Sequence, residues 1–283
     1  MAIEANPKQD LDSHSCNRTG YGPPTRQELL EHYPARFTWP QLKAFINSGD
    51  LGLLKRDKAL QHRYNVWSAD IRKRHGSTVN YLLDYRLQWG KPDTLSLLPS
   101  ELEECEETTT NSSEVSGVVP QYFTADLPFN SGLIYIMQND WPYSVPLAIE
   151  HTVIWSRVPI FYPSLIPSAI EARIQQDGVW GFTGSNTPIE ELPSLESCLL
   201  ALADWGVTIE SMIRSPKGSY EEEEMVRQVG QEVDGFVKRR WQESKWETAW
   251  FVNPPRLQSI PGLAHIHVFA RRKSSSELAS WNA

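Results

Sequence analysis

Apolar residues recur at helical spacing in the first third of the chain. Thr38 and Gln41 have the spacing of a capping box, and apolar residues suited to one helix face follow them. A second amphipathic pattern extends from Leu60 to Ile71, and Gly76 is placed to end that helix. We therefore expect two consecutive helices in this part of the chain.

The pattern changes in the second half to short runs of β-branched and aromatic residues, which are typical of strands. Strands are predicted over residues 132–138, 151–155, 249–252 and 265–271, and further helices over residues 81–89, 195–205 and 221–240. These elements predict an α+β fold in which an N-terminal helical layer packs on a small, mainly antiparallel sheet in a single domain.

Polar segments delimit this domain, which we place at residues 25–273. Residues 1–24 are polar and end in Gly and Pro, and residues 274–283 follow the last predicted strand. Both segments are expected to be disordered tails. Glutamates and then a Thr, Ser and Asn stretch occupy residues 99–119, where we expect a flexible, solvated loop.

Composition narrows the class of protein. The chain of 283 residues is 40% hydrophobic and 22% charged, which excludes global disorder. A net charge of −8 excludes a uniformly basic nucleic-acid binder, and no DNA partner is expected. Three distant cysteines without a CxxC pair argue against a disulfide framework or a cysteine zinc site. Without a signal-peptide pattern or about 18 consecutive apolar residues, we expect a cytoplasmic protein with no membrane partner.

The last predicted strand carries two histidines. Side chains alternate along a strand, so His265, His267, Phe269 and Arg271 share one face, with the two imidazoles about 7 Å apart at their Cα atoms. Such a pair suits acid–base catalysis or metal binding, although an edge strand with incidental histidines remains an alternative. Zinc would need a third ligand, for which His151 is the best candidate, and no metal site is predicted.

The loop before this strand offers polar groups for an acyl centre. Asn253 and Ser259 are candidate oxyanion or amide ligands, and Ser259 is also a candidate nucleophile with His265 or His267 as its base. No GxSxG elbow supports the nucleophile, and an ordinary turn serine is the alternative. Trp250, just before the loop, is a candidate substrate-binding aromatic residue.

A turn rich in aromatic residues forms a third candidate site. Asp140 is followed by Trp141 and Tyr143, a setting that binds cations by charge and by π-faces. Glu150 and His151 lie at the start of the next predicted strand, and two nearby carboxylates are suited to bidentate binding of a guanidinium group. The alternative is a turn whose Asp only accepts hydrogen bonds from local backbone amides.

Several long motifs resemble a known family. Residues 48–56, 139–143, 150–155 and 249–269 resemble the fungal N-acetylglucosamine-induced protein family, and the resemblance extends over about residues 35–273. The family name records an induction condition and not a reaction. The fungal arginine-containing cyclodipeptide synthases are similar to this same family.

The second resemblance implies an enzyme of secondary metabolism that needs no cofactor. It would join arginine to a second amino acid, as a diketopiperazine, from arginyl-tRNA and a second aminoacyl-tRNA. A histidine base, oxyanion donors and an anionic, aromatic-lined arginine pocket are then required. The candidates are His265 and His267 for the base, Asn253 and Ser259 for the acyl centre, and Asp140, Trp141, Tyr143, Glu150, His151 and Trp250 for substrate binding.

Four clusters of Lys and Arg are candidate phosphate contacts for tRNA, although scattered solvated charge is the default. They are Lys55, Arg56, Lys58 and Arg63; Arg72, Lys73 and Arg74; Lys238, Arg239 and Arg240; and Arg271, Arg272 and Lys273. Two other functions stay open. One is a non-catalytic binding or regulatory protein of the sugar response. The other is a hydrolase or transferase that uses the His-x-His strand, as the histidine-triad nucleotide hydrolases do, although Phe269 replaces their third histidine.

Overall fold

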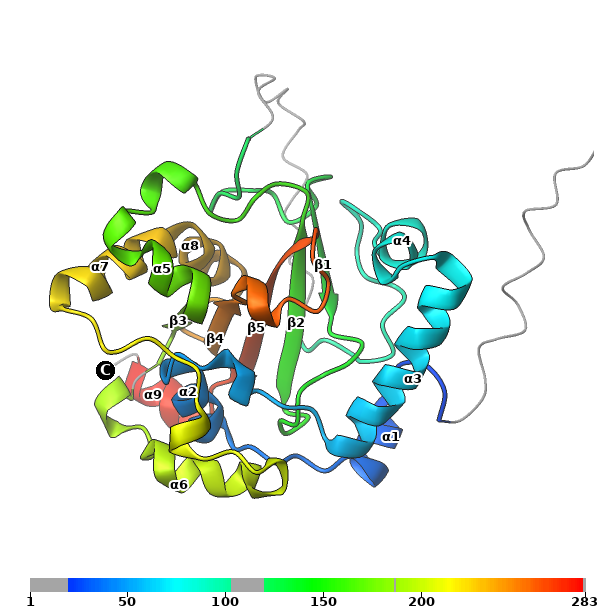
Figure 1. Ribbon diagram of the computed structural model, residues 1–283, viewed down its shortest axis with the longest axis horizontal. Coiled ribbons are helices and arrows are strands. Elements are labelled where there is room, and N and C mark those ends of the chain that lie inside the picture. Colours follow the sequence, from blue (N-terminus) through cyan, green and yellow to red (C-terminus); the bar gives the residue numbers. More distant parts are fainter. Residues whose placement is uncertain (1–19, 103–119, 186, 282–283) are drawn as a thin grey trace, which may run out of the picture.

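A computed structural model describes residues 20–102, 120–185 and 187–281 of the chain (Figure 1). Its centre is a five-stranded sheet in the order β1-β2-β5-β4-β3, in which every neighbouring pair is antiparallel. The strands are β1 (Ile134–Gln138), β2 (Ile149–Ser156), β3 (Val179–Thr183), β4 (Trp246–Val252) and β5 (Ala264–Arg272). The predicted α+β class with an antiparallel sheet is confirmed.

Three helices cover one face of the sheet. They are α5 (Ser168–Asp177), α7 (Tyr220–Val229) and α8 (Gln231–Arg240), which lie together in Figure 1. Ile266 and Val268 of β5 are fully buried in the apolar core between these helices and the sheet. The helical covering is therefore not confined to the N-terminal part of the chain.

The opposite face of the sheet is covered by the predicted N-terminal layer. Helix α2 (Trp39–Asn47) starts with the expected Thr38–Gln41 capping box, and its apolar face packs on β4 and β5. Helix α6 (Leu195–Leu199) joins the same core. Within this core Phe269 is completely buried, so this face of β5 is also an interior surface.

A second group of N-terminal helices lies beside β1 and β2 (Figure 1). It comprises α1 (Arg26–His32), α3 (Lys58–His75) and α4 (Thr78–Tyr81). Trp67 of α3 packs against Trp141 of the β1–β2 connection, with ring centroids 5.1 Å apart. This contact holds α3 over the connection that carries several candidate site residues.

The C-terminal tail is shorter than predicted. Residues 275–281 form helix α9 (Ser275–Trp281), so the prediction of disorder from residue 274 is wrong for this segment. Glu277 forms an ion pair with Arg271 of β5 and accepts a hydrogen bond from the backbone N–H of Ser274, which ties the helix to the sheet. Residues 1–19 and 282–283 lie outside the described residues.

Two other predicted flexible segments are ordered at their ends. Gly22 and Pro24 are buried, which places residues 20–24 against the helices. Ser100 donates a hydrogen bond to Glu150 of β2 at 3.0 Å, so residues 99–102 belong to the folded domain. The rest of the predicted loop, residues 103–119, lies outside the described residues.

Two predicted helices are interrupted for identifiable reasons. The segment predicted over residues 81–89 becomes a π-helical turn, Leu82–Arg86, whose last side chain reaches inward to Asp140. The segment predicted over residues 221–240 divides into α7 and α8 at Gly230. A Cβ atom there would lie 2.8 Å from the Trp250 ring, so the close approach to the sheet requires glycine.

Candidate functional site

The two histidines of β5 lie on the interior face that α2 and α6 cover. His265 and His267 share this face with Phe269, as alternation predicted, but both are more than 90% buried. The interpretation of a half-exposed edge strand is therefore wrong, because β5 lies between β2 and β4. His151 of β2 pairs directly with Phe269 across the ladder and adds a third imidazole.

The three imidazoles form a connected cluster. His151 Nε2 and His267 Nδ1 are 3.0 Å apart, within hydrogen-bonding distance. The rings of His265 and His267 meet edge to face with centroids 5.2 Å apart, and His265 Nδ1 lies 2.9 Å from the carbonyl oxygen of Leu263. Among the described residues, no three His, Cys, Asp or Glu side chains are arranged to hold a metal ion.

Burial makes this cluster electrically neutral near neutral pH. Desolvation lowers the pKa of His151 and His267 well below the ordinary histidine value, and the nearby Arg56 guanidinium lowers both further. The other imidazoles also lower the pKa of His267, and burial lowers the pKa of His265. Each neutral imidazole has one N–H that donates and one nitrogen that accepts, so the rings can form hydrogen bonds with one another.

The β1–β2 connection lies against this cluster, as the sequence suggested. Tyr143 stacks on His151 with ring centroids 5.0 Å apart, and its backbone N–H donates to His151 Nδ1 at 3.3 Å. Asn139 places its side-chain amide nitrogen 3.2 Å from His151 Nε2. Asn253 acts as a hydrogen-bond partner of the Tyr143 side chain, whose pKa is raised mainly by burial.

Arg56 is a site residue that we assigned only to a basic cluster. Its Nε donates to the backbone oxygen of Trp141 at 2.8 Å, and its guanidinium lies over the rings of Tyr64 and Tyr143. The residue belongs to the 48–56 motif of the family resemblance, which was the available signal.

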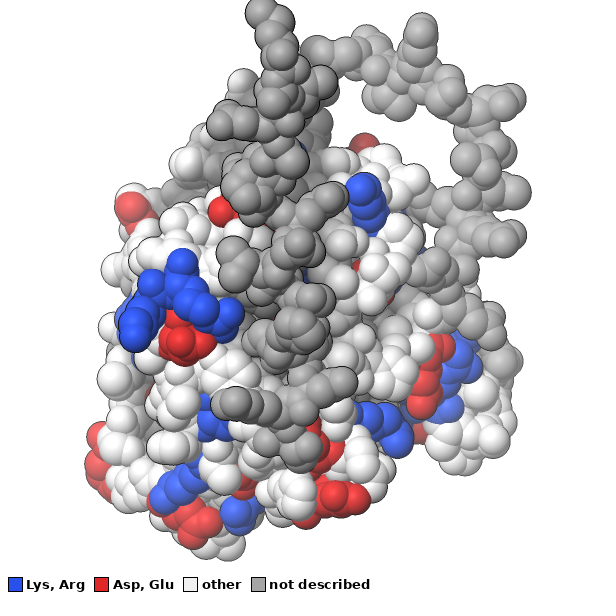
Figure 2. Space-filling model, turned by 90° about the vertical axis from the view of Figure 1, so that its right-hand side faces the viewer, with Lys and Arg blue, Asp and Glu red and all other residues white. Residues whose placement is uncertain are grey.

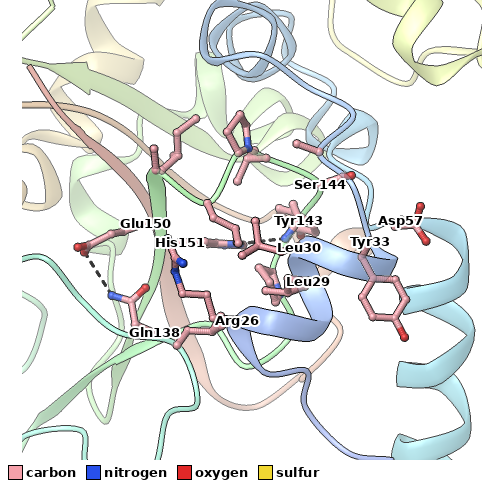
Figure 3. Close-up of a pocket in the computed structure, with 18 of the residues that line it drawn as sticks. Arg26, Leu29, Leu30, Tyr33, Asp57, Gln138, Tyr143, Ser144, Glu150 and His151 are labelled. Atoms are coloured by element: carbon pink, nitrogen blue, oxygen red, sulfur yellow. Dashed lines mark hydrogen bonds between the residues drawn. The ribbon is translucent and has the colours of Figure 1, made fainter. Parts of the chain in front are cut away.

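A cavity of about 380 Å³ opens beside the start of β2 (Figure 3). Arg26 and Leu29 of α1 and Tyr33, which directly follows this helix, form one wall, and Tyr143 and His151 line another. Gln138 and Glu150 line the cavity from the other face of the sheet, because side chains alternate along β1 and β2. The volume falls within the usual range for small-molecule sites.

Glu150 is a buried carboxylate of this cavity that forms no ion pair with a described residue. Its side chain is buried and accepts hydrogen bonds from Ser100 and Gln138 and from the backbone N–H of Glu101. All of these donors are neutral, and no Lys, Arg or His of the described segments forms an ion pair with it. Desolvation consequently raises the pKa of Glu150. A buried carboxylate without a counter-charge is energetically costly, so such a group either takes up a proton or attracts a cation.

Asp140 does not face this cavity. Arg86 binds its carboxylate in bidentate fashion, with N···O distances of 2.8 and 2.9 Å, and also pairs with Asp93. Burial raises the pKa of Asp140, while Arg86 opposes the rise. We predicted that Asp140 binds a guanidinium group of the substrate. In the structure it binds the guanidinium group of Arg86 instead, so Asp140 is not available to a substrate.

Two predicted substrate-binding tryptophans are structural. Trp141 packs its ring between Tyr64 and Trp67, away from the cavity lining. Trp250 points to the opposite face of the sheet from the histidines, and its indole N–H donates to Asp234 of α8 at 3.1 Å. Neither ring lines the cavity, and both contribute their buried area to core packing, so the structure gives no support to their assignment to the substrate.

The loop serine is separated from the site. Ser259 is exposed, and no hydrogen bond within the described residues connects it to a histidine. Asn253 is buried beside Tyr143, so it belongs to the cluster but does not line the cavity. The structure therefore offers no support for a Ser259 nucleophile.

The basic clusters are largely engaged in local contacts. Arg63 is buried and pairs with Glu28 at 3.0 Å, while Arg74 pairs with Asp70 at 2.9 Å. On the face shown in Figure 2, Lys and Arg groups of the described residues lie close to Asp and Glu groups. Within the described segments no helix has the length and apolar character that crossing a bilayer requires.

Fold and site together define the class: an α+β protein with a buried histidine cluster beside a cavity that Glu150 lines. The chain belongs to the DUF3605 family, described as a protein of unknown function, which it matches over residues 38–166 and 210–271. Both the histidine cluster and Glu150 fall within the matched ranges.

Two curated relatives are similar to the chain. One is N-acetylglucosamine-induced protein 1 of Candida albicans, 30% identical over 125 residues, which are 44% of this chain and 44% of the relative. The match thus spans less than half of that protein. The other is an uncharacterized protein of Saccharomyces cerevisiae, 24% identical over 246 residues, which are 84% of this chain and 82% of that one. The resemblance to the N-acetylglucosamine-induced proteins is confirmed.

A solved structure, described as the crystal structure of HTC1, aligns with 86% of this chain and 92% of its own. Its sequence identity is 19% and its TM-score 0.34, a similarity too low to support an argument about the site.

Proposed function

We propose that this protein is an aminoacyl-tRNA-dependent cyclodipeptide synthase that joins arginine to a second amino acid. The observation that carries the proposal is the buried, unpaired carboxylate of Glu150 in a cavity that His151 also lines. A guanidinium presents two parallel N–H donors to a carboxylate and is less strongly hydrated than an ammonium, so it suits a buried site. The sequence resemblance supplies the reaction class.

The reaction consists of two acyl transfers. In the first, the α-amine of one aminoacyl ester attacks the carbonyl carbon of the other, forming an amide and releasing the 3′-hydroxyl of one tRNA. In the second, the free α-amine of the dipeptidyl ester attacks its own ester carbonyl, closes the diketopiperazine and releases the second tRNA. Each step moves one proton from the attacking amine to the departing hydroxyl, and no oxidant or reductant is needed.

His151 is the histidine of the cluster that lines the cavity, so we assign it the transfer of this proton. Its neutral ring accepts the amine proton and returns it to the leaving oxygen. His267 contacts His151 but does not line the cavity, so the predicted catalytic role moves from His267 to His151. Because an activated ester reacts downhill with an amine, positioning supplies much of the expected rate.

Expression in a bacterial host followed by mass spectrometry of the culture tests the proposal. We expect a new diketopiperazine that contains arginine, and its formation by purified protein should stop when RNase destroys the tRNA. Glu150→Gln keeps the shape of the side chain and removes its charge, so we expect product to fall by about 100-fold, the range for a lost buried ion contact.

The matched control is Glu190→Gln, because Glu190 is an exposed carboxylate outside the cavity lining. This variant should retain wild-type product levels. Folded protein that makes no arginine diketopiperazine from arginyl-tRNA and a mixture of aminoacyl-tRNAs would contradict the proposal and favour a non-catalytic binding protein.

A further inference from the structure

The hydrogen bonds of the histidine cluster determine where its protons lie. The backbone N–H of Tyr143 can only donate, so His151 Nδ1, which it contacts at 3.3 Å, must carry a lone pair. The neutral ring of His151 then has its proton on Nε2, which donates to His267 Nδ1 at 3.0 Å. His267 in turn carries its own proton on Nε2.

The tautomer of His265, at the other end of the cluster, is determined in the same way. The carbonyl oxygen of Leu263 can only accept, so His265 Nδ1, at 2.9 Å, carries the proton. Two of the three tautomers thus follow from rigid backbone groups, and that of His267 follows from its neighbour. Asn139 does not distinguish the two tautomers, because its amide nitrogen lies 3.4 Å from His151 Nδ1 and 3.2 Å from Nε2.

We infer that His267 is a positioning residue that holds His151 in the tautomer with its proton on Nε2 and its lone pair on Nδ1. The catalytic use of His151 rests on the proposed function, but the tautomer itself does not depend on it. Without an acceptor at His267 Nδ1, a buried imidazole N–H would be unsatisfied, and such a group is expensive to bury. The remaining hydrogen bond from Tyr143 to His151 Nδ1, at 3.3 Å, would then be too weak to keep the His151 ring in a single orientation.

Two substitutions of His267 separate positioning from packing. His267→Asn places Oδ1 near the position of Nδ1, so an acceptor for His151 remains. His267→Leu replaces the imidazole by a side chain of similar volume that offers no hydrogen-bond acceptor to His151. A role in packing alone predicts similar behaviour of the two variants, whereas a positioning role predicts that only the asparagine variant resembles the wild type.

The first measurement is ¹⁵N NMR of the histidine rings in the folded protein, without substrate. We expect His151 Nδ1 to resonate as an unprotonated nitrogen and Nε2 as a protonated one in the wild type and in His267→Asn. In His267→Leu the two nitrogens should show averaged or duplicated signals. A protonated Nδ1 in the wild type, or an unchanged spectrum in His267→Leu, overturns the inference whether or not the protein makes a diketopiperazine.

The second measurement is the rate of product formation. With arginyl-tRNA as the varied substrate, we expect His267→Leu to lower kcat by about 100-fold, as for a misplaced catalytic group, with KM changed by less than about twofold because Glu150 is untouched. His267→Asn should recover most of kcat. Equal losses in the two variants contradict a positioning role.

Discussion

Asp140 lies near the start of the β1–β2 connection and Glu150 just after its end, yet their carboxylates have different partners. Asp140 is bound by Arg86, whose guanidinium also pairs with Asp93, so its charge is compensated within the chain. Glu150 receives hydrogen bonds from neutral donors and lines an open cavity. The first carboxylate therefore stabilises the fold, while the second forms no ion pair with a described residue and is the group that, in our proposal, binds the arginine of the substrate.

The comparison shows how a guanidinium would be held at Glu150. Around Arg86 the protein provides carboxylates together with the hydroxyl of Tyr135, which is 3.1 Å from the guanidinium. Around the cavity it provides Glu150 together with the aromatic rings of Tyr33 and Tyr143. The two regions thus present similar chemical groups, but Arg26, which lines the cavity, forms no ion pair with Glu150.

The largest expected effect comes from removing the internal cation. Arg86→Met leaves Asp140 and Asp93 buried without a counter-charge, so the free energy of unfolding should fall by about 3–5 kcal/mol. Urea unfolding followed by circular dichroism measures the change. Arg72→Met, at an exposed position of α3, should change stability by less than about 0.5 kcal/mol. Similar stability of both variants would mean that the ion pairs of Arg86 with Asp140 and Asp93 do not stabilise the fold.

A second, smaller effect separates the two carboxylates directly. Asp140→Asn removes the partner of a buried arginine and should lower the free energy of unfolding by about 2 kcal/mol, within the range for a charged hydrogen bond. Glu150→Gln removes a buried charge that has no counter-charge, so it should leave stability unchanged or slightly raised. The difference between their urea midpoints is the quantity to compare. A larger loss for Glu150→Gln than for Asp140→Asn would reverse our interpretation of the two sites.

The smallest effect concerns pH and the histidine cluster beside Glu150. Below about pH 6.5 the unfolded chain protonates His267, whereas the folded protein keeps it neutral because burial lowers its pKa. Acidification therefore destabilises the folded state, by about 1 kcal/mol for this histidine between about pH 7.5 and 5.5.

His267→Asn should reduce the loss of stability between these two pH values by that amount. Comparing the variant with the wild type cancels the opposite contribution of Glu150 and Asp140, whose raised pKa values stabilise the folded state on acidification. Identical pH dependence of the two proteins would show that His267 is not kept neutral.

Local signals in the sequence were sufficient for much of the fold. The capping box at Thr38 and the glycine at Gly76 mark the ends of α2 and α3, and alternation along β5 placed His265 and His267 on one face. Strand β3 was missed because Gly181 interrupts its pattern. The closeness of Gly181 to the Trp250 ring explains the glycine only after the sheet is known.

The candidate site was predictable only where neighbours in space are also neighbours in sequence. Tyr143 and His151 lie on either side of one connection, and the structure brings them together. The partner of Asp140 could not be found, because Arg86 reaches it through a π-helical turn 54 residues earlier in the chain. Aromatic residues beside a carboxylate therefore indicate a cation site, but they do not show whether an Arg or Lys of the same chain occupies it.

Titration of the purified protein with arginine methyl ester, measured by calorimetry, tests the central claim most directly. This probe carries the guanidinium and an uncharged ester in place of the carboxylate of free arginine. We predict saturable binding to the wild type and to Asp140→Asn, and none to Glu150→Gln. Equal binding to the wild type and to Glu150→Gln, or no binding to folded wild-type protein, would contradict the assignment of the cavity to the arginine side chain.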